Sequence, residues 1–209
     1  MHDSRILSPQ AIGEWSGGLV LVSIIPYAIR TYERKIQPVV TTWSLWSLIG
    51  LAVVLTYRSS GAEANVWPAV FGFINPILIT ILSAWKHGEW KRLTLSERLC
   101  FLFGVASLTM WIFMRRDAGL AQYALYVAIA ADICAAIPTI IFVWKQPDRD
   151  RPVSWIVFAI GYFVAIFAIP EETVANWILP LYMTVVSLVV AFPLVLYRLR
   201  QRIPLRHWV

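Results

Sequence analysis

Hydrophobic residues along this chain gather into seven apolar stretches separated by short charged segments. Each stretch holds about 16 to 25 residues, close to the length at which an α-helix crosses the hydrocarbon core of a bilayer. The pattern therefore predicts seven membrane-spanning helices with little chain outside the membrane. These helices are expected over residues 11–29, 39–57, 67–85, 99–114, 119–144, 153–169 and 177–197.

The composition indicates the same class of protein. Of 209 residues, 59% are hydrophobic and only 14% are charged, which is far from the composition of a soluble globular domain. The two cysteines, Cys100 and Cys134, fall inside expected helices and are interpreted as packing residues. The N-terminal segment is short and lacks a cleavage pattern of small residues, so no signal peptide is expected. We predict an all-α integral membrane protein.

Basic residues are distributed unevenly between the two ends of the expected helices. The end that includes the N-terminus carries only Arg5, Arg58, Arg115 and Arg116. The other end carries fourteen basic residues, namely Arg30, Arg34, Lys35, Lys86, Lys91, Arg92, Arg98, Lys145, Arg149, Arg151, Arg198, Arg200, Arg202 and Arg206. Short cytoplasmic loops are enriched in lysine and arginine, so this bias predicts an N-terminus outside and a C-terminus in the cytoplasm, in a plasma membrane such as a bacterial inner membrane. The net charge of +6 then reflects orientation, and no nucleic-acid partner is expected.

An internal repeat divides the chain. The stretch from Pro26, PYAIRTYERKIQPVVTTWSLWSLIG, returns from Pro138 as PTIIFVWKQPDRDRPVSWIVFAIG. Pro138 follows Pro26 by 112 residues, and Trp155 follows Trp43 by the same 112 residues, which we call the repeat spacing. The helix over residues 99–114 has no counterpart and returns the second copy to the orientation of the first, which makes the repeats parallel. We predict two parallel three-helix repeats joined by a linker helix. The expected units are residues 1–85 (first repeat), 86–118 (basic loop and linker helix) and 119–209 (second repeat and basic tail).

Polar and aromatic residues deep in the expected helices are the candidate substrate-binding residues. Asn75 lies near the middle of the third helix, where an amide either joins helices by hydrogen bonds or faces a polar cavity. Ser187 matches Asn75 by the repeat spacing, and Phe158 matches Trp46 in the same way. For Trp46, packing and substrate contact both remain open. Asp132, near the centre of the fifth helix, completes the set.

Asp132 needs compensation, because a charged aspartate at the bilayer centre costs about 2.5–3.5 kcal/mol. The expected helix interiors contain no lysine or arginine to pair with it. One alternative is a protonated Asp132 that donates a hydrogen bond to the carbonyl of Cys134, which Pro138 leaves without its helical donor. The other is that Asp132 faces a water-filled path and exchanges a proton or binds a cationic group. Val20 holds the matching position in the first repeat, so the carboxylate breaks the symmetry.

The segments SIIPYAIRTY and AAIPTIIFVW, each ending the first helix of a repeat, resemble the SWEET and PQ-loop superfamily of small-solute transporters. The resemblance covers nearly the whole chain and includes the arrangement of two three-helix repeats around a linker. Asn75 matches an asparagine that the family places in its third helix, and Ser187 stands where many members have a second asparagine. The resemblance implies that these positions line a central substrate site, and that Pro26 and Pro138 act as hinges between outward-open and inward-open states.

The resemblance implies a transporter, either a facilitator or a proton-coupled carrier, that moves a small polar solute by alternating access. Sugar is the substrate typical of the family. However, Tyr27 and Thr139 stand where a PQ-loop has glutamine, and the second and sixth helices lack the proline of SWEET proteins. Nicotinamide riboside permeases share the layout and use tryptophan-rich sites, so a vitamin precursor or an amino acid is an alternative substrate. A non-transporting membrane sensor or assembly protein is a further alternative, and homo-oligomer formation remains open.

Catalytic motifs are not found in the sequence. There is no Ser/His/Asp set, HExxH sequence or Gly-rich phosphate loop, and His2, His87 and His207 fall in expected termini or loops. We therefore expect no enzymatic activity, cofactor or metal site. The expected partners are the lipid bilayer and the solute.

Overall fold

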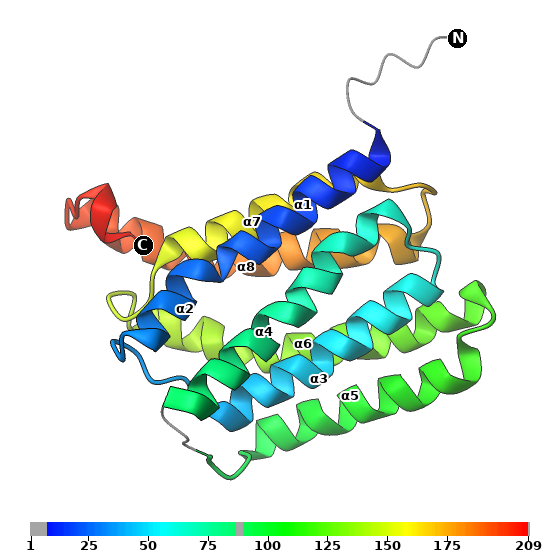
Figure 1. Cartoon of the computed structure of the whole chain (residues 1–209), viewed down its shortest axis with the longest axis horizontal. Helices are drawn as coiled ribbons and strands as arrows, with labels where there is room; N and C mark the ends of the chain where they lie inside the picture. Colours follow the sequence, from blue (N-terminus) through cyan, green and yellow to red (C-terminus); the bar gives the residue numbers. More distant parts are fainter. Residues whose placement is uncertain (1–7, 87–89, 209) are drawn as a thin grey trace.

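The computed structural model describes residues 8–86 and 90–208, and the part of the chain that it describes is helical, with no strand. Arg5, His2 and His87 lie outside the described residues. Figure 1 shows the helices running between two ends of the molecule. They are α1 (Pro9–Ser23), α2 (Ile25–Tyr32), α3 (Val40–Ser59), η1 (Ala64–Val66), α4 (Trp67–Lys86), α5 (Leu95–Met114), α6 (Ala118–Lys145), α7 (Pro152–Ala165), η2 (Ile166–Ala168), α8 (Val174–Arg200) and η3 (Leu205–His207).

Among the described residues, six helical segments are long and apolar enough to cross a membrane: Pro9–Tyr32, Val40–Ser59, Ala64–Lys86, Leu95–Met114, Ala118–Lys145 and Val174–Arg200. The segment Pro152–Ala168, which was expected to be the sixth of seven crossings, is a shorter apolar helix. Its last turn, η2, is a 3-10 helix that ends just before Pro170. An all-helical chain with this many apolar spans is an integral membrane protein, because a helix satisfies all of its interior backbone groups within lipid.

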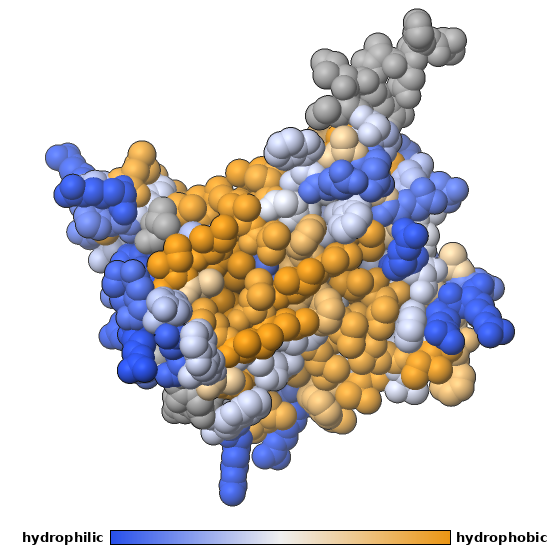
Figure 2. Space-filling model, viewed as in Figure 1, coloured by the Kyte–Doolittle hydropathy of each residue, from blue (hydrophilic) through white to orange (hydrophobic). Residues whose placement is uncertain are grey.

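The outer surface of the bundle is apolar in its middle. Figure 2 shows hydrophobic side chains covering the centre of one face, with hydrophilic side chains gathered toward the two ends. Phe113 and Trp85 expose 81% and 72% of their surface. Exposed apolar area on this scale is costly in water and natural in a bilayer.

The helices pack in the same order in both halves of the chain. In the first half, α4 packs against both α1 and α3, and in the second half α8 packs against both α6 and α7. The halves meet mainly where α1 packs against α7 and α3 packs against α6. Helix α5 packs against α3 and α6, at the side of the bundle.

Glycines bring α1 close to its neighbours. A Cβ at Gly13 would overlap the carbonyl oxygen of Ala64, and a Cβ at Gly161 of α7 would lie 2.7 Å from Cγ2 of Val20. Small residues at such crossings let helix backbones approach within lipid, where van der Waals packing holds helices together. Gly13 and Gly161 therefore fix how α1 sits against η1 and α7.

Pro26 and Pro138 have different effects on their helices. The single helix expected over residues 11–29 is interrupted at Ile24, two residues before Pro26. The Ile24 N–H donates to the carbonyl of Leu21 and not to that of Val20. The Val20 carbonyl instead accepts a 2.6 Å hydrogen bond from the hydroxyl of Ser23. In contrast, α6 continues through Pro138 without interruption.

Candidate functional site

Asn75 lies near the middle of α4, on the face turned toward α1. Its side chain is buried, and its amide Nδ2 donates a 2.8 Å hydrogen bond to the carbonyl of Val20. This carbonyl is the one released by the break at Ile24, so a neighbouring helix satisfies it. The amide oxygen Oδ1 of Asn75 is buried and has no hydrogen-bond partner within the described part of the chain. Such an acceptor costs about 1–3 kcal/mol when it is left unpaired.

Asp132 lies in the interior of α6 and is bound by the neighbouring helix α8. The hydroxyl of Tyr182 donates a 2.6 Å hydrogen bond to its Oδ2 atom. A bond to the Cys134 carbonyl was one of the two alternatives from the sequence, and the hydrogen bond that the structure shows for this side chain is the one from Tyr182. The reason is that α8 packs against α6 and brings the phenol of Tyr182 to the carboxylate. The sequence of α6 alone does not contain this partner.

The other three candidate residues have separate surroundings. Ser187 is buried and donates to the carbonyl of Met183 in its own helix at 2.7 Å. The ring of Phe158 packs 5.0 Å from that of Tyr162, and Trp46 is half-buried on α3. Among the residues that the structure describes, no hydrogen bond or ring contact joins one of the five candidates directly to another.

Two of these contacts have acceptors at corresponding places in the two halves, although their donors, Asn75 and Tyr182, do not match by the repeat spacing. Val20 and Asp132 are related by the repeat spacing, and each receives a hydrogen bond from the third helix of its own half. The first half uses the backbone carbonyl of Val20, and the second half uses the carboxylate of Asp132. The corresponding joint in the second half therefore contains an ionisable group.

A buried polar network joins the halves at the end of the bundle that carries few basic residues. The hydroxyl of Tyr57 on α3 donates to the Asn176 carbonyl on α8 at 3.0 Å. The amide of Asn65 donates to the same hydroxyl and to Oδ1 of Asn176, the latter at 3.4 Å. All three side chains are at most 1% exposed. This network was not predicted from the sequence, although Asn65 comes shortly before Pro68 and Asn176 shortly before Pro180, and these two prolines are related by the repeat spacing.

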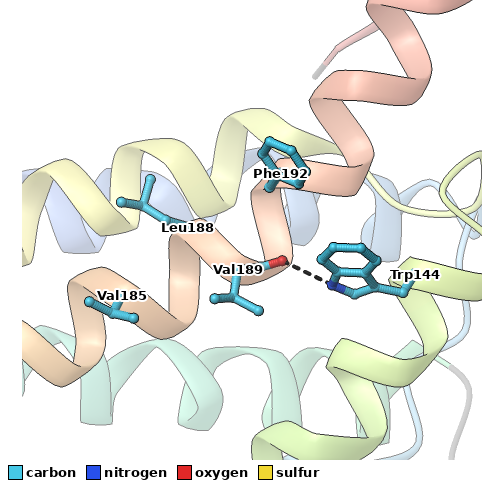
Figure 3. Close-up of a pocket in the computed structure, with 5 residues that line it drawn as sticks. All are labelled: Trp144, Val185, Leu188, Val189 and Phe192. Atoms are coloured by element: carbon cyan, nitrogen blue, oxygen red, sulfur yellow. Dashed lines mark hydrogen bonds between the residues drawn. The ribbon is translucent and has the colours of Figure 1, made fainter.

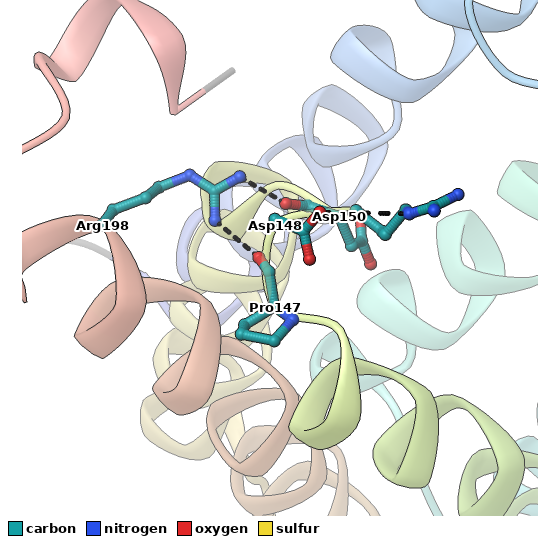
Figure 4. Close-up of polar contacts among 5 residues, drawn as sticks. Pro147, Asp148, Asp150 and Arg198 are labelled. Carbon is teal, nitrogen blue, oxygen red and sulfur yellow. Dashed lines mark hydrogen bonds and ion pairs between the residues drawn. The ribbon is translucent and has the colours of Figure 1, made fainter. Parts of the chain in front are cut away.

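At the opposite end, Arg198 has a place that the sequence did not predict. We expected it in a solvated basic tail, but its side chain is fully buried at the end of α8. Its Nη1 donates to the carbonyls of Pro147 and Leu194, both at 3.1 Å, and its Nη2 donates to the carbonyl of Asp150. Figure 4 shows the guanidinium directed at the loop between α6 and α7. Arg198 thus fixes this loop to α8.

Two pockets occur away from the predicted site. One, of about 320 Å³, is an apolar groove where Trp144 of α6 lies beside four residues of α8, Val185, Leu188, Val189 and Phe192 (Figure 3). The indole of Trp144 donates to the Val189 carbonyl at 3.3 Å. This carbonyl has no helical donor, because Pro193 lacks the N–H that would bond it. All five side chains are exposed, so the groove faces lipid.

The other pocket, of about 570 Å³, lies at the N-terminal end of α1 and is lined by Pro9, Gln10, Arg58, Glu63, Ala64, Val66 and Trp67.

Metal-binding residues do not cluster in the described part of the chain, where no group of three or more His, Cys, Asp or Glu could hold an ion. Comparison with known proteins found no matching family model, no similar curated protein and no similar solved structure.

Proposed function

We propose that this chain is a membrane transporter that moves a small polar solute by alternating access through a site between two three-helix repeats. The packing order supports the two repeats. In each half the third helix lies against the first and the second, and α5 stands beside the bundle as a linker would. Two related units of this kind can rock against each other around a site near the middle of the membrane.

The observation that carries the proposal is the unpaired Oδ1 of Asn75. Buried polar groups are nearly always hydrogen-bonded, so an open acceptor in the middle of an apolar helix requires a reason. A solute hydroxyl or N–H group that reaches Oδ1 would satisfy it. The Nδ2 of the same amide holds the Val20 carbonyl, so the side chain is oriented before the solute arrives.

Asp132 and Tyr182 supply the polar group of the second half. A carboxylate in lipid with no described lysine or arginine bonded to it is either protonated or exposed to water during part of a cycle. This supports a proton-coupled carrier over a simple facilitator. Phe158, Trp46 and Ser187 complete the proposed lining of the site, in which aromatic rings bind the apolar faces of a solute such as a sugar, a vitamin precursor or an amino acid.

The buried network of Tyr57, Asn65 and Asn176 supports a state closed at one end. It links α3 and η1 of the first half to α8 of the second, so it must open before a solute can enter there. By the distribution of basic residues we assign this end to the outside and the C-terminus to the cytoplasm. Single cysteines at Glu172 and Gln201, in a chain lacking Cys100 and Cys134, should be labelled from outside and inside respectively, and the reverse pattern would exclude this orientation.

The alternative is a non-transporting sensor or assembly protein. One observation favours it: the hydrogen bonds of Asn75 and Asp132 both join neighbouring helices, as purely structural bonds would. The experiment that separates the two functions is uptake by proteoliposomes of sugars, amino acids and vitamin precursors, with and without an inward proton gradient. Accumulation above protein-free vesicles supports the transporter, and its absence for every class supports the alternative.

A further inference from the structure

The basic end of the bundle contains two buried arginine nitrogens that have no hydrogen-bond partner within the described residues. They are the Nε atoms of Arg151, which precedes α7, and of Arg198, near the end of α8. Arg198 is fully buried, and the hydrogen bonds of its Nη atoms go to carbonyl oxygens. The hydrogen bonds of the guanidinium therefore go to neutral groups, and the single charge of Asp150 nearby offsets only part of the positive charge that Arg198 shares with Arg151 and Arg30.

The nearest carboxylate is already committed elsewhere. Oδ1 of Asp150 accepts the backbone N–H of Arg151 at 2.7 Å, and Oδ2 accepts the indole N–H of Trp155 at 3.0 Å. Asp148 pairs with Arg149 at 3.9 Å on the exposed side of the loop. Figure 4 shows Arg198 bonded to the backbone of this loop and not to a carboxylate.

A third arginine reaches the same place from the other half of the molecule. Arg30 lies in the last turn of α2, and α2 packs against α7. Burial lowers the pKa of Arg151, and the positive charge of Arg30 lowers it further, while the Asp150 carboxylate opposes this only in part. Two arginines from different halves therefore repel each other in front of the buried Arg198.

The start of α7 adds hydrogen-bond donors that can bind an anion. Its N-cap residue, Arg151, makes no side-chain bond to the first turn, whereas Asp117 and Thr173 cap α6 and α8 with their side chains. Backbone N–H groups in the first turn of a helix attract anions, and α7 begins two residues after Asp150, whose carbonyl accepts a hydrogen bond from Nη2 of the fully buried Arg198.

We propose that Arg30, Arg151 and Arg198, together with the start of α7, form a binding site for a phosphate-type oxyanion that joins the two halves at the basic end of the bundle. A phosphate offers several acceptor oxygens to arginine donors and offsets the repulsion between Arg30 and Arg151. The headgroup of an anionic phospholipid and free phosphate share this chemistry. The site lies where a helical span ends, at the depth of lipid headgroups.

The test uses the whole chain in detergent, with its melting temperature as the readout. One arm adds dioleoylphosphatidylglycerol or, as the neutral comparison, dioleoylphosphatidylcholine. The other arm adds sodium phosphate against sodium chloride of equal ionic strength. The proposal expects stabilisation by phosphatidylglycerol alone if a lipid headgroup is the ligand, and by phosphate as well if the site accepts a free anion. Equal stabilisation by both lipids together with no effect of phosphate would overturn it.

Variants locate the site. Arg151→Gln and Arg30→Gln should each weaken the apparent affinity about fivefold, the effect expected of one basic residue near an anionic headgroup. Arg149→Gln is the matched control, because Arg149 lies in the same loop, is exposed and pairs with Asp148. It should bind as the unmodified chain does. Equal weakening in Arg149→Gln would show a diffuse surface charge and would overturn the proposed site, as would unchanged affinity in both test variants.

Discussion

The hydroxyl of Tyr182 on α8 lies 2.6 Å from Oδ2 of Asp132 on α6, and it donates a hydrogen bond to that carboxylate in the interior of the second half. The corresponding joint of the first half is made by the Asn75 amide and the Val20 carbonyl. The two halves thus hold their first and third helices together at related positions with different chemistry. Only the second of these joints contains a carboxyl group that can gain or lose a proton.

Removing the phenol should destabilise the protein. In Tyr182→Phe the carboxyl of Asp132 remains buried without its partner, and we expect a loss of about 1–3 kcal/mol in the free energy of unfolding. The measurement is unfolding of the purified chain in mixed micelles. Tyr126→Phe is the control, since that hydroxyl bonds Gln122 within α6 and is only partly buried. Equal stability of the two variants would show that the Tyr182 bond contributes nothing.

Replacing the carboxyl should change the response of transport to pH. Asp132→Asn keeps an acceptor for the Tyr182 hydroxyl, so the chain should fold, but the side chain can no longer exchange a proton. If Asp132 couples transport to protons, uptake by proteoliposomes should lose its dependence on pH. A variant that keeps the pH profile of the unmodified chain would make Asp132 a packing residue.

The contact between α1 and α7 should be sensitive to a single methyl group. A Cβ at Gly161 would meet Cγ2 of Val20 at 2.7 Å and the Ser16 carbonyl oxygen at 3.0 Å. We expect Gly161→Ala to lower the free energy of unfolding by about 1–3 kcal/mol through overpacking. Gly18→Ala is the matched control, because no atom lies within 4 Å of the added Cβ, and it should be neutral or slightly stabilising. A neutral Gly161→Ala would contradict this close approach of the halves.

The network at the end with few basic residues should act as a closure. Tyr57→Phe removes the hydroxyl that Asn65 and Asn176 share, so the two halves should separate more readily there. A cysteine at Ala175, which is 2% exposed, reports this opening. In a chain without Cys100 and Cys134, Ala175→Cys should react with a water-soluble maleimide faster in the Tyr57→Phe background. An unchanged labelling rate would count against a closing role.

Sequence periodicity was sufficient for most of the helices, although it predicted one continuous helix where the structure has an interruption before Pro26. It was not sufficient to distinguish Pro26 from Pro138. A proline removes one backbone bond in either helix, but whether the helix is interrupted depends on what takes up the released carbonyl. The interruption at Ile24 releases the carbonyl of Val20, which is not the Val22 carbonyl that Pro26 itself leaves without a helical donor. Ser23 and Asn75 bind the Val20 carbonyl, and those donors come from the local turn and from another helix.

The polar contacts between helices were harder to predict for the same reason. A sequence shows that Asp132 needs a partner, but the partner lies on α8, far along the chain, and is supplied by packing. Arg198 belongs to a run of basic residues and was expected in solvent, yet the loop before α7 folds over it. Asn65 and Asn176 were detectable from their spacing within the repeat, because each stands a few residues before a matching proline.

The central claim is that a solute binds at the unpaired amide oxygen of Asn75 on its way across the membrane. It is tested most directly by counterflow uptake into proteoliposomes, using a solute that the screen identifies. Asn75→Ala should raise the concentration needed for half-maximal uptake by about tenfold or more, because the solute loses a hydrogen bond. Thr109→Ala, which removes an exposed hydroxyl bonded within α5, should leave it unchanged. An Asn75→Ala chain that folds and transports as the unmodified chain does would contradict the proposed site.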